Sequence, residues 1–122
     1  VPIPLHTRRK RWRGFNQAEV LCQAIANNLN LLNDGVSTFA KATADYPLVR
    51  CKSTAVQKDL KKEARQKNIA DAFKLAPGTD VHNKNIILVD DVATTGATLL
   101  EAAKILKRNG AAKVFCLTVA RD

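Results

Sequence analysis

The sequence predicts an α/β fold with a mainly parallel sheet flanked by helices, and three observations carry this prediction. Residues 86–89 form a continuous apolar run, which is typical of a strand covered on both faces. Residues 97–109 carry apolar side chains at helical spacing, and Gly110 is placed to end that helix. Residues 114–119 form a second buried-type strand. A strand, a helix and a strand within about 35 residues predict a right-handed βαβ unit.

The first part of the chain predicts a strand, a loop and a helix. Residues 1–5 alternate proline with apolar residues, so we expect a short strand at a sheet edge or a strand terminus. Residues 6–14 predict a basic loop that contains no acidic side chain. Asn16 and Glu19 resemble a capping box, and the apolar spacing that follows predicts a helix over residues 16–30.

The middle of the chain has weaker patterns. Residues 33–45 combine turn chemistry with a low-complexity run, and we expect a surface loop or a short helical insert. Residues 46–51 predict a second strand. Residues 53–68 are polar and basic, which leaves two interpretations open, a solvated helix or a mobile basic flap. The chain returns to the core at residues 73–75, and a turn follows at residues 77–78.

Length and composition limit the class of protein. The 122 residues suggest a single domain, residues 1–122, and 20 Lys and Arg against 11 Asp and Glu give a net charge of +9. This charge favours an anionic partner: nucleic acid, a phosphorylated small molecule or an acidic surface. Cys22, Cys51 and Cys116 are widely spaced, so we expect reduced thiols in a cytoplasmic protein. No apolar run reaches the roughly 18–20 residues that span a membrane.

Two acidic residues and a threonine-rich turn lie between the strand and the helix of the βαβ unit. Ligands of α/β sheets bind beyond the carboxyl ends of strands, and a helix N-terminus suits phosphate. Gly96 allows the backbone to approach an anion, while Asp90 and Asp91 suit a vicinal diol or Mg²⁺ held through water. Each feature alone also fits a polar strand end or a helix cap. The P-loop and Gly-x-Gly-x-x-Gly patterns do not occur in this segment.

Several segments together resemble one known family. Residues 86–98 resemble the phosphoribosyl pyrophosphate (PRPP) binding motif of type I phosphoribosyltransferases. A narrower resemblance is to the ComF family within this group. It rests on residues 1–6, on residues 13–17, and on the pattern Thr54-x-x-Gln57, Arg65-x-x-Asn68 and Ala72-Phe73. These segments cover most of the chain, so the resemblance implies a type I phosphoribosyltransferase-like fold with a mobile flap at residues 53–68.

The resemblance also implies a role for each matching residue. Asp90 and Asp91 would bind the ribose hydroxyls of PRPP and hold Mg²⁺ through water, and together with Thr94 they form the implied catalytic set. The implied 5′-phosphate site is Ala93, Thr94, Thr95, Gly96, Ala97 and Thr98. The implied pyrophosphate contacts are Arg8, Arg9, Arg11 and Arg13 from the basic loop and Gln57, Arg65 and Asn68 from the flap.

The implied reaction displaces pyrophosphate from C1 of the ribose by a nucleophile, usually a base nitrogen, with Mg²⁺ and arginine neutralising the leaving group. The hypoxanthine-guanine branch has an aspartate base at the position of Thr94. The threonine implies a substrate that needs no such base, or PRPP binding without turnover. The chain contains no four-cysteine zinc module such as ComF proteins commonly carry ahead of this domain, and residues 33–45 read as an insertion.

Two functional hypotheses follow. The first is a ComF-type phosphoribosyltransferase-fold protein that binds PRPP or a nucleotide with Mg²⁺, transfers phosphoribosyl to an acceptor and serves DNA uptake, as the family's association with natural competence implies. The alternative is a non-catalytic nucleic-acid-binding or regulatory module that uses the same pocket as a sensor. Single-stranded DNA and a second copy of the chain are further expected partners. Trp12 and Phe15 are the aromatic residues beside the basic loop, and two are too few for a convincing base-stacking surface.

Overall fold

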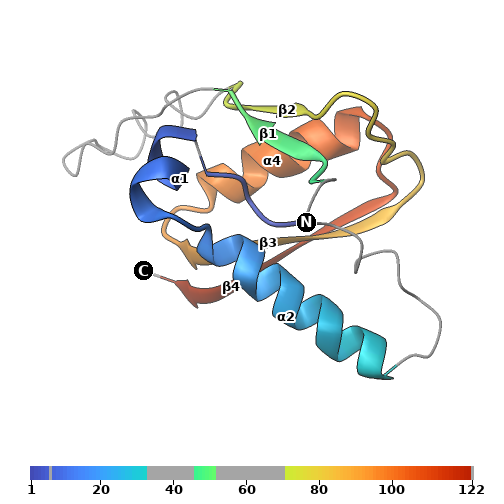
Figure 1. The fold of residues 1–122 in the computed structure, drawn as a ribbon. Coiled ribbons are helices and arrows are strands. Elements are labelled where there is room, and N and C mark those ends of the chain that lie inside the picture. The colour runs from blue at the N-terminus through green and yellow to red at the C-terminus, as the bar shows by residue number, and fades with distance from the viewer. Residues whose placement is uncertain (6, 33–45, 52–70, 122) are drawn as a thin grey trace.

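The structure, a computed structural model, describes residues 1–5, 7–32, 46–51 and 71–121. Its elements in chain order are α1 (Thr7–Arg13), α2 (Gln17–Leu32), β1 (Leu48–Arg50), β2 (Phe73–Leu75), β3 (Asn85–Ala93), α4 (Ala97–Arg108) and β4 (Lys113–Arg121) (Figure 1). The α/β class is confirmed. The expected insertion at residues 33–45 and the expected flap at residues 53–68 lie outside the described residues.

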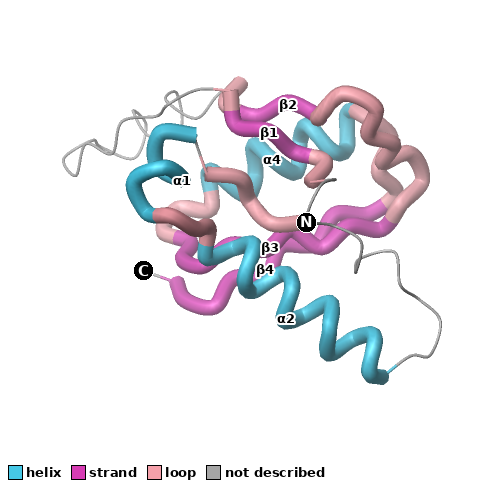
Figure 2. The backbone as a smooth tube through the Cα atoms, in the orientation of Figure 1, coloured by secondary structure: helices cyan, strands magenta, loops and turns pink. Residues whose placement is uncertain are grey.

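The βαβ unit is present as predicted. Strands β3 and β4 pair in parallel, from Asn85 opposite Lys113 to Ala93 opposite Arg121, and α4 connects them (Figure 2). Helix α4 ends at Arg108, and Gly110 follows the C-cap Asn109 with a φ of 92°, a conformation that glycine adopts readily. Helix α4 buries Leu99, Ala102 and Leu106 in the core. Ile86 and Leu88 of β3 belong to the same core cluster.

The N-terminal segment lies along the other edge of β3. The Ile3 N–H donates to the Val89 carbonyl at 2.8 Å, and the Val89 N–H donates to the Val1 carbonyl at 2.9 Å. The resulting pairing is a single parallel bridge between Pro2 and Val89, so the strand predicted over residues 1–5 is right in place but too long. Proline has no N–H to donate, which limits the pairing of this segment.

A second, smaller sheet consists of β1 and β2. These strands pair antiparallel, with Leu48 opposite Leu75 and Arg50 opposite Phe73. The strand expected at residues 46–51 is confirmed as β1, and the return to the core predicted at residues 73–75 is made by β2. The antiparallel pairing of the two strands departs from the mainly parallel sheet that the sequence predicted. Leu48 and Phe73 are buried in the same core cluster as Leu88, so the two sheets share one core.

Helix α2 begins as the sequence predicted. Asn16 is its N-cap, because the Ala18 N–H donates to Asn16 Oδ1 at 3.1 Å. The Asn16 amide also donates to the Ile3 carbonyl at 3.0 Å, which fixes the helix to the N-terminal segment. Asn16 is the buried polar residue of the described chain, with 3% of its surface exposed.

Two predictions about individual elements were wrong. Residues 6–14 were expected to form a loop, but Thr7–Arg13 form α1, because lysine and arginine are good helix formers and no breaker precedes Gly14. Residues 114–119 were expected to be buried, but Phe115 is 55% and Val119 is 72% exposed in β4. Only β3 borders β4 within the described sheets, so β4 is an edge strand, and its apolar run does not imply coverage on both faces.

Candidate functional site

The paired acids lie inside β3 and not after it, since pairing with β4 continues to Ala93. The register pairs Asp90 with Thr118 and resumes at Val92 with Ala120, so it omits Asp91. At this irregularity, the Asp91 N–H donates to Asp90 Oδ1 at 3.0 Å, and the Val92 N–H donates to Asp91 Oδ1 at 2.8 Å. One oxygen of each carboxylate is thereby oriented by the backbone, at the carboxyl end of a parallel strand.

Burial raises the pKa of Asp90 to about 6. The N–H of Asp91 opposes this effect and the carboxylate of Asp91 adds to it, while the positive charge of Arg50 lowers the pKa. Arg50 therefore lies close enough to Asp90 to act on it electrostatically. A carboxylate that loses hydration in this way gains from a bound cation or from hydroxyl donors.

The turn between β3 and α4 brings the threonine-rich segment to the N-terminus of the helix. Gly96 is the N-cap with a φ of 71°, and α4 has no side-chain cap. The Ala97 N–H makes a long hydrogen bond of 3.4 Å to Thr95 Oγ1. A Cβ added at Gly96 would meet no atom within 4 Å. Glycine is therefore favoured here by its positive φ and not by a lack of space for a side chain. Thr94 and Thr95 are exposed, and Thr98 is half-buried.

The arginines expected to face a pyrophosphate lie on α1 and not on a loop. Arg8, Arg9, Arg11 and Arg13 all belong to this helix, which Figure 1 shows at the end of the sheet to which β3 points. Arg11 and Arg13 are exposed, and Arg13 Nη1 donates to Gln17 Oε1 at 3.4 Å. The expected flap contacts Gln57, Arg65 and Asn68 lie outside the described residues.

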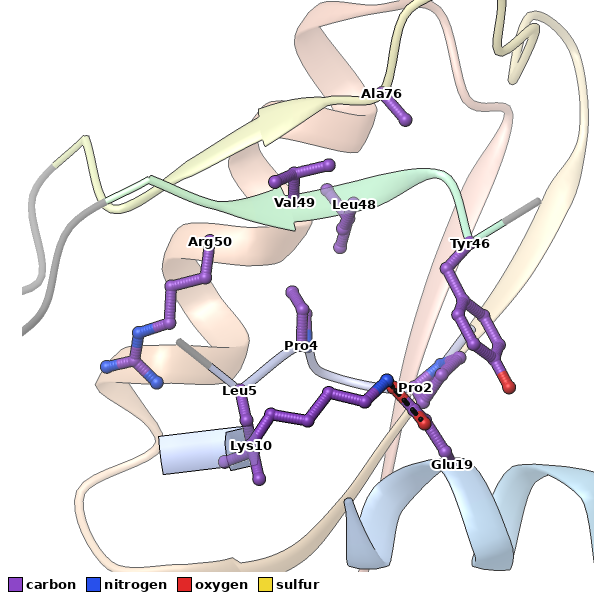
Figure 3. Close-up of a pocket in the computed structure, with 10 residues that line it drawn as sticks. All are labelled: Pro2, Pro4, Leu5, Lys10, Glu19, Tyr46, Leu48, Val49, Arg50 and Ala76. Atoms are coloured by element: carbon purple, nitrogen blue, oxygen red, sulfur yellow. Dashed lines mark hydrogen bonds and ion pairs between the residues drawn. The ribbon is translucent and has the colours of Figure 1, made fainter. Parts of the chain in front are cut away.

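A cavity of about 270 Å³ lies between the N-terminal segment and β1 (Figure 3). Tyr46 lies at one end of it and Arg50 at the other, and Lys10 forms an ion pair with Glu19 at 2.8 Å along its floor. Its apolar walls include Pro2, Pro4 and Leu48.

Arg50 is the site residue that sequence reasoning missed. Its guanidinium carbon lies 5.6 Å from the centre of the Phe73 ring, a cation–π distance. The signal in the sequence was a single arginine directly after the apolar pair Leu48 and Val49; in the structure it ends β1 and is half-buried.

Metal-ligating clusters and membrane spans are both absent from the described residues. They contain no group of three or more His, Cys, Asp or Glu side chains that would hold a metal ion. Two adjacent carboxylates without a third ligand fit Mg²⁺, which keeps several waters and takes other ligands from substrate phosphates. None of the described helices has the length and apolar character needed to cross a membrane.

The chain is similar to a known domain family and to several known proteins. The phosphoribosyl transferase domain family matches residues 16–122. The chain is 39% identical over 119 residues to the "DNA utilization protein YhgH" of Salmonella typhi, covering 96% of this chain and 47% of that protein. It is 34% identical over 122 residues to "Competence protein F" of Haemophilus influenzae, covering 99% and 49%.

A third relative is "Competence protein ComFC" of Bacillus subtilis, 33% identical over 123 residues, with 100% of this chain and 44% of that protein covered. The chain thus spans about half the length of the curated relatives that it matches. No solved structure matches the chain at a significant level.

Proposed function

Because the chain belongs to the phosphoribosyl transferase domain family, with a ComF-type fold, we propose that it binds PRPP or a nucleotide with Mg²⁺. The proposed site is the corner between β3 and α4, formed by residues 90–98. One observation carries the proposal. The backbone-oriented carboxylates of Asp90 and Asp91 lie six residues or fewer before the N-cap of a helix that lacks a side-chain cap. A diol site beside an anion site matches a ribose that carries a phosphate.

Each part of the corner has a separate task in this proposal. The carboxylates of Asp90 and Asp91 accept hydrogen bonds from the 2′- and 3′-hydroxyls of the ribose. The N–H groups and hydroxyls of residues 94–98 hold the 5′-phosphate, at the N-terminus of a 12-residue helix that begins at Ala97. Asp90 and Asp91 would hold Mg²⁺ through water, and bound Mg²⁺ supplies positive charge to the pyrophosphate. Arg11 and Arg13 add cations at the same end of the sheet.

We extend the proposal to phosphoribosyl transfer in DNA uptake or use. The names of the relatives, two competence proteins and a DNA utilization protein, support this extension. The side chain of Thr94 cannot take a proton from an acceptor at neutral pH. The proposed acceptor therefore has a nucleophilic nitrogen that needs no prior deprotonation.

One observation favours nucleic acid as a second candidate ligand. Trp12 lies on α1 with 84% of its surface exposed, between the exposed Arg11 and Arg13. An exposed aromatic ring among cations suits base stacking on single-stranded DNA. In that case affinity would fall steeply with rising salt, and Trp12→Ala would weaken DNA binding while leaving PRPP binding unchanged.

Calorimetric titration with PRPP, in the presence and absence of Mg²⁺, tests the main proposal. The double variant Asp90→Asn with Asp91→Asn should weaken binding by about tenfold or more, since charge-assisted hydrogen bonds become neutral ones. Asp80→Asn is the matched control, because this exposed carboxylate precedes β3 at the opposite end of the strand. Absence of PRPP binding by the folded chain, or equal affinity in the double variant, would reject the proposal.

A further inference from the structure

Strand β4 pairs with β3 along one edge, and no strand of the described sheets pairs with its other edge, the open edge. The ladder determines which backbone groups face outward. Val89 directs its N–H and carbonyl to the N-terminal segment, so by alternation Leu88 directs its own to β4. In a parallel pair the residue opposite then points away. Cys116, opposite Leu88, therefore has its N–H and carbonyl at the open edge, as do Val114 and Thr118.

The side chains of β4 beside the open edge are apolar. Phe115, Leu117 and Val119 alternate along the strand, so they share one face, and all three are exposed. Helix α4 packs against the other face of this sheet, where Leu88 is buried in the core. A nine-residue edge strand with an exposed apolar face is the kind of surface to which an extended segment adds as a further strand.

Cations gather where β4 begins. The Ala112 N–H donates to the Lys84 carbonyl at 2.9 Å, and Lys107 Nζ donates to the Ala112 carbonyl at 2.8 Å. Lys113 follows directly, so three exposed lysines surround Ala112. Within the described residues these lysines bond to neutral carbonyls, that of Asp80 among them, and the ion pairs of the described chain include none of them. The open edge therefore has a positively charged end.

A second copy of the chain fits the open edge poorly. Antiparallel pairing of two β4 strands about Leu117 would place Lys113 opposite Arg121, and parallel pairing in register would place Lys113 opposite its own copy. Like charges directly opposite each other destabilise a pair of strands. The net charge of +9 adds to this repulsion. Charge complementarity thus favours a partner with negative charge.

We propose that the open edge of β4 binds an extended segment of a partner protein, with apolar residues at alternate positions and several carboxylates at the end beside Lys113. The backbone of the segment pairs with the outward groups of residues 114–118, and its apolar side chains extend the face of residues 115–119. Its carboxylates lie among the three lysines. The Lys113 end of β4 is opposite Asn85, where β3 begins, so it is distant from the corner of residues 90–98, and the inference does not depend on the proposed function.

Synthetic peptides with blocked ends test this inference. Two fluorescein-labelled peptides of about nine residues join three glutamates, at the N-terminal or the C-terminal end, to alternating valine and threonine. One of them, according to strand direction, should bind about tenfold more tightly than its glutamine counterpart, since each exposed charge pair adds about two- to threefold at low salt. High salt should reduce the difference. Serine in place of valine should abolish binding. Fluorescence anisotropy with the 122-residue chain measures each affinity.

Two sets of variants test the backbone edge and the charge separately. Thr118→Pro removes an outward N–H and leaves the ladder with β3 in place, so peptide affinity should fall about tenfold or more. Thr118→Val keeps the N–H and is the matched control. The double variant Lys84→Gln with Lys113→Gln should remove most of the preference for glutamate, whereas Lys74→Gln, at an exposed position of β2, should not. Circular dichroism establishes that each variant is folded.

Sedimentation velocity of the chain alone distinguishes a partner segment from a second copy. We expect a monomer, and a dimer that Thr118→Pro returns to the monomer would assign the edge to a second copy and overturn the proposal. Equal affinity for the glutamate and glutamine peptides would also overturn it, as would unchanged binding in a folded Thr118→Pro variant or an unchanged glutamate preference in the lysine double variant. Binding that requires the glutamates, the valines and the lysines supports it.

Discussion

At Asp90, the protonation state that stabilises the fold differs from the protonation state that the proposed ligand requires. Burial raises its pKa to about 6, which means that the folded chain holds the proton more tightly than the unfolded chain, where aspartate titrates near pH ~3.9. The protonated form therefore stabilises the fold below that pH, and this contribution is lost as the pH rises through about 6. The ionised form that a diol or Mg²⁺ requires is the form that the fold tolerates less well.

Asp90→Asn should therefore stabilise the chain in the absence of ligand. We expect a gain on the order of 1 kcal/mol near neutral pH, after allowance for the partial exposure of the group, and no gain near pH ~4. Urea denaturation at the two pH values measures it. A variant that is equally stable or less stable than the parent near neutral pH would contradict the assigned burial effect.

PRPP affinity should itself depend on pH through the same group. Since ligand binding requires ionised Asp90, affinity should rise as the pH increases through about 6 and level off above it. Titrations across this range measure the effect, and Asp90→Asn should remove it. A pH profile that is the same in the variant would assign the titration to another group.

The sequence predicted the residues of the corner better than those of the cavity, for a physical reason. Asp90, Asp91 and residues 94–98 are contiguous, so one strand and one helix suffice to bring them together. Arg50 precedes Asp90 by 40 positions, and its charge acts on Asp90 because β1 and β3 border the same core. This placement is set by the packing of the whole core and leaves no local pattern.

At the scale of elements, α4 stabilises the fold through one face. Leu106 is fully buried in the core, whereas Leu100 on the same helix is 59% exposed. Leu106→Ala should cost about 2–5 kcal/mol of unfolding free energy, while Leu100→Ala should cost about 0.5 kcal/mol or less. Urea denaturation compares the two, and equal losses would contradict the assigned face of the helix.

The turn before α4 offers a matched glycine pair. Gly96 and Gly78 have φ values of 71° and 77°, and a Cβ at either position would meet no atom within 4 Å. Alanine at either position should therefore cost about 1 kcal/mol of stability through backbone strain alone. Only Gly96→Ala should also weaken PRPP binding in a calorimetric titration. Equal PRPP affinities in the two variants would separate this turn from the ligand.

The elements that the sequence misjudged show what local patterns omit. The basic run of residues 6–14 predicts a loop, yet helix propensity and the position of Gly14 produce helix α1. The apolar run of residues 114–119 predicts a buried strand, yet much of β4 is exposed. Burial depends on neighbouring elements, and the described part of the chain leaves Phe115, Leu117 and Val119 exposed.

At the scale of the molecule, one core supports two sheets, since Leu48, Phe73 and Leu88 are buried in the same cluster. Arg50 lines the cavity beside β1, and its positive charge acts on Asp90. The net charge of +9 fits an anionic ligand at this end of the molecule, where α1 gathers five of the cations. The fold class was predictable from the βαβ unit, but the second sheet, in which β1 and β2 pair antiparallel, was not.

A backbone NMR titration of the chain with PRPP and Mg²⁺ tests directly whether residues 90–98 form the phosphoribosyl site. The largest shifts of amide resonances should fall on residues 90–98, with smaller ones at α1, and Asp80→Asn should not alter this pattern. Shifts confined to other surfaces, with the amides of the β3–α4 turn unmoved at saturation, would show that this corner is not the phosphoribosyl site.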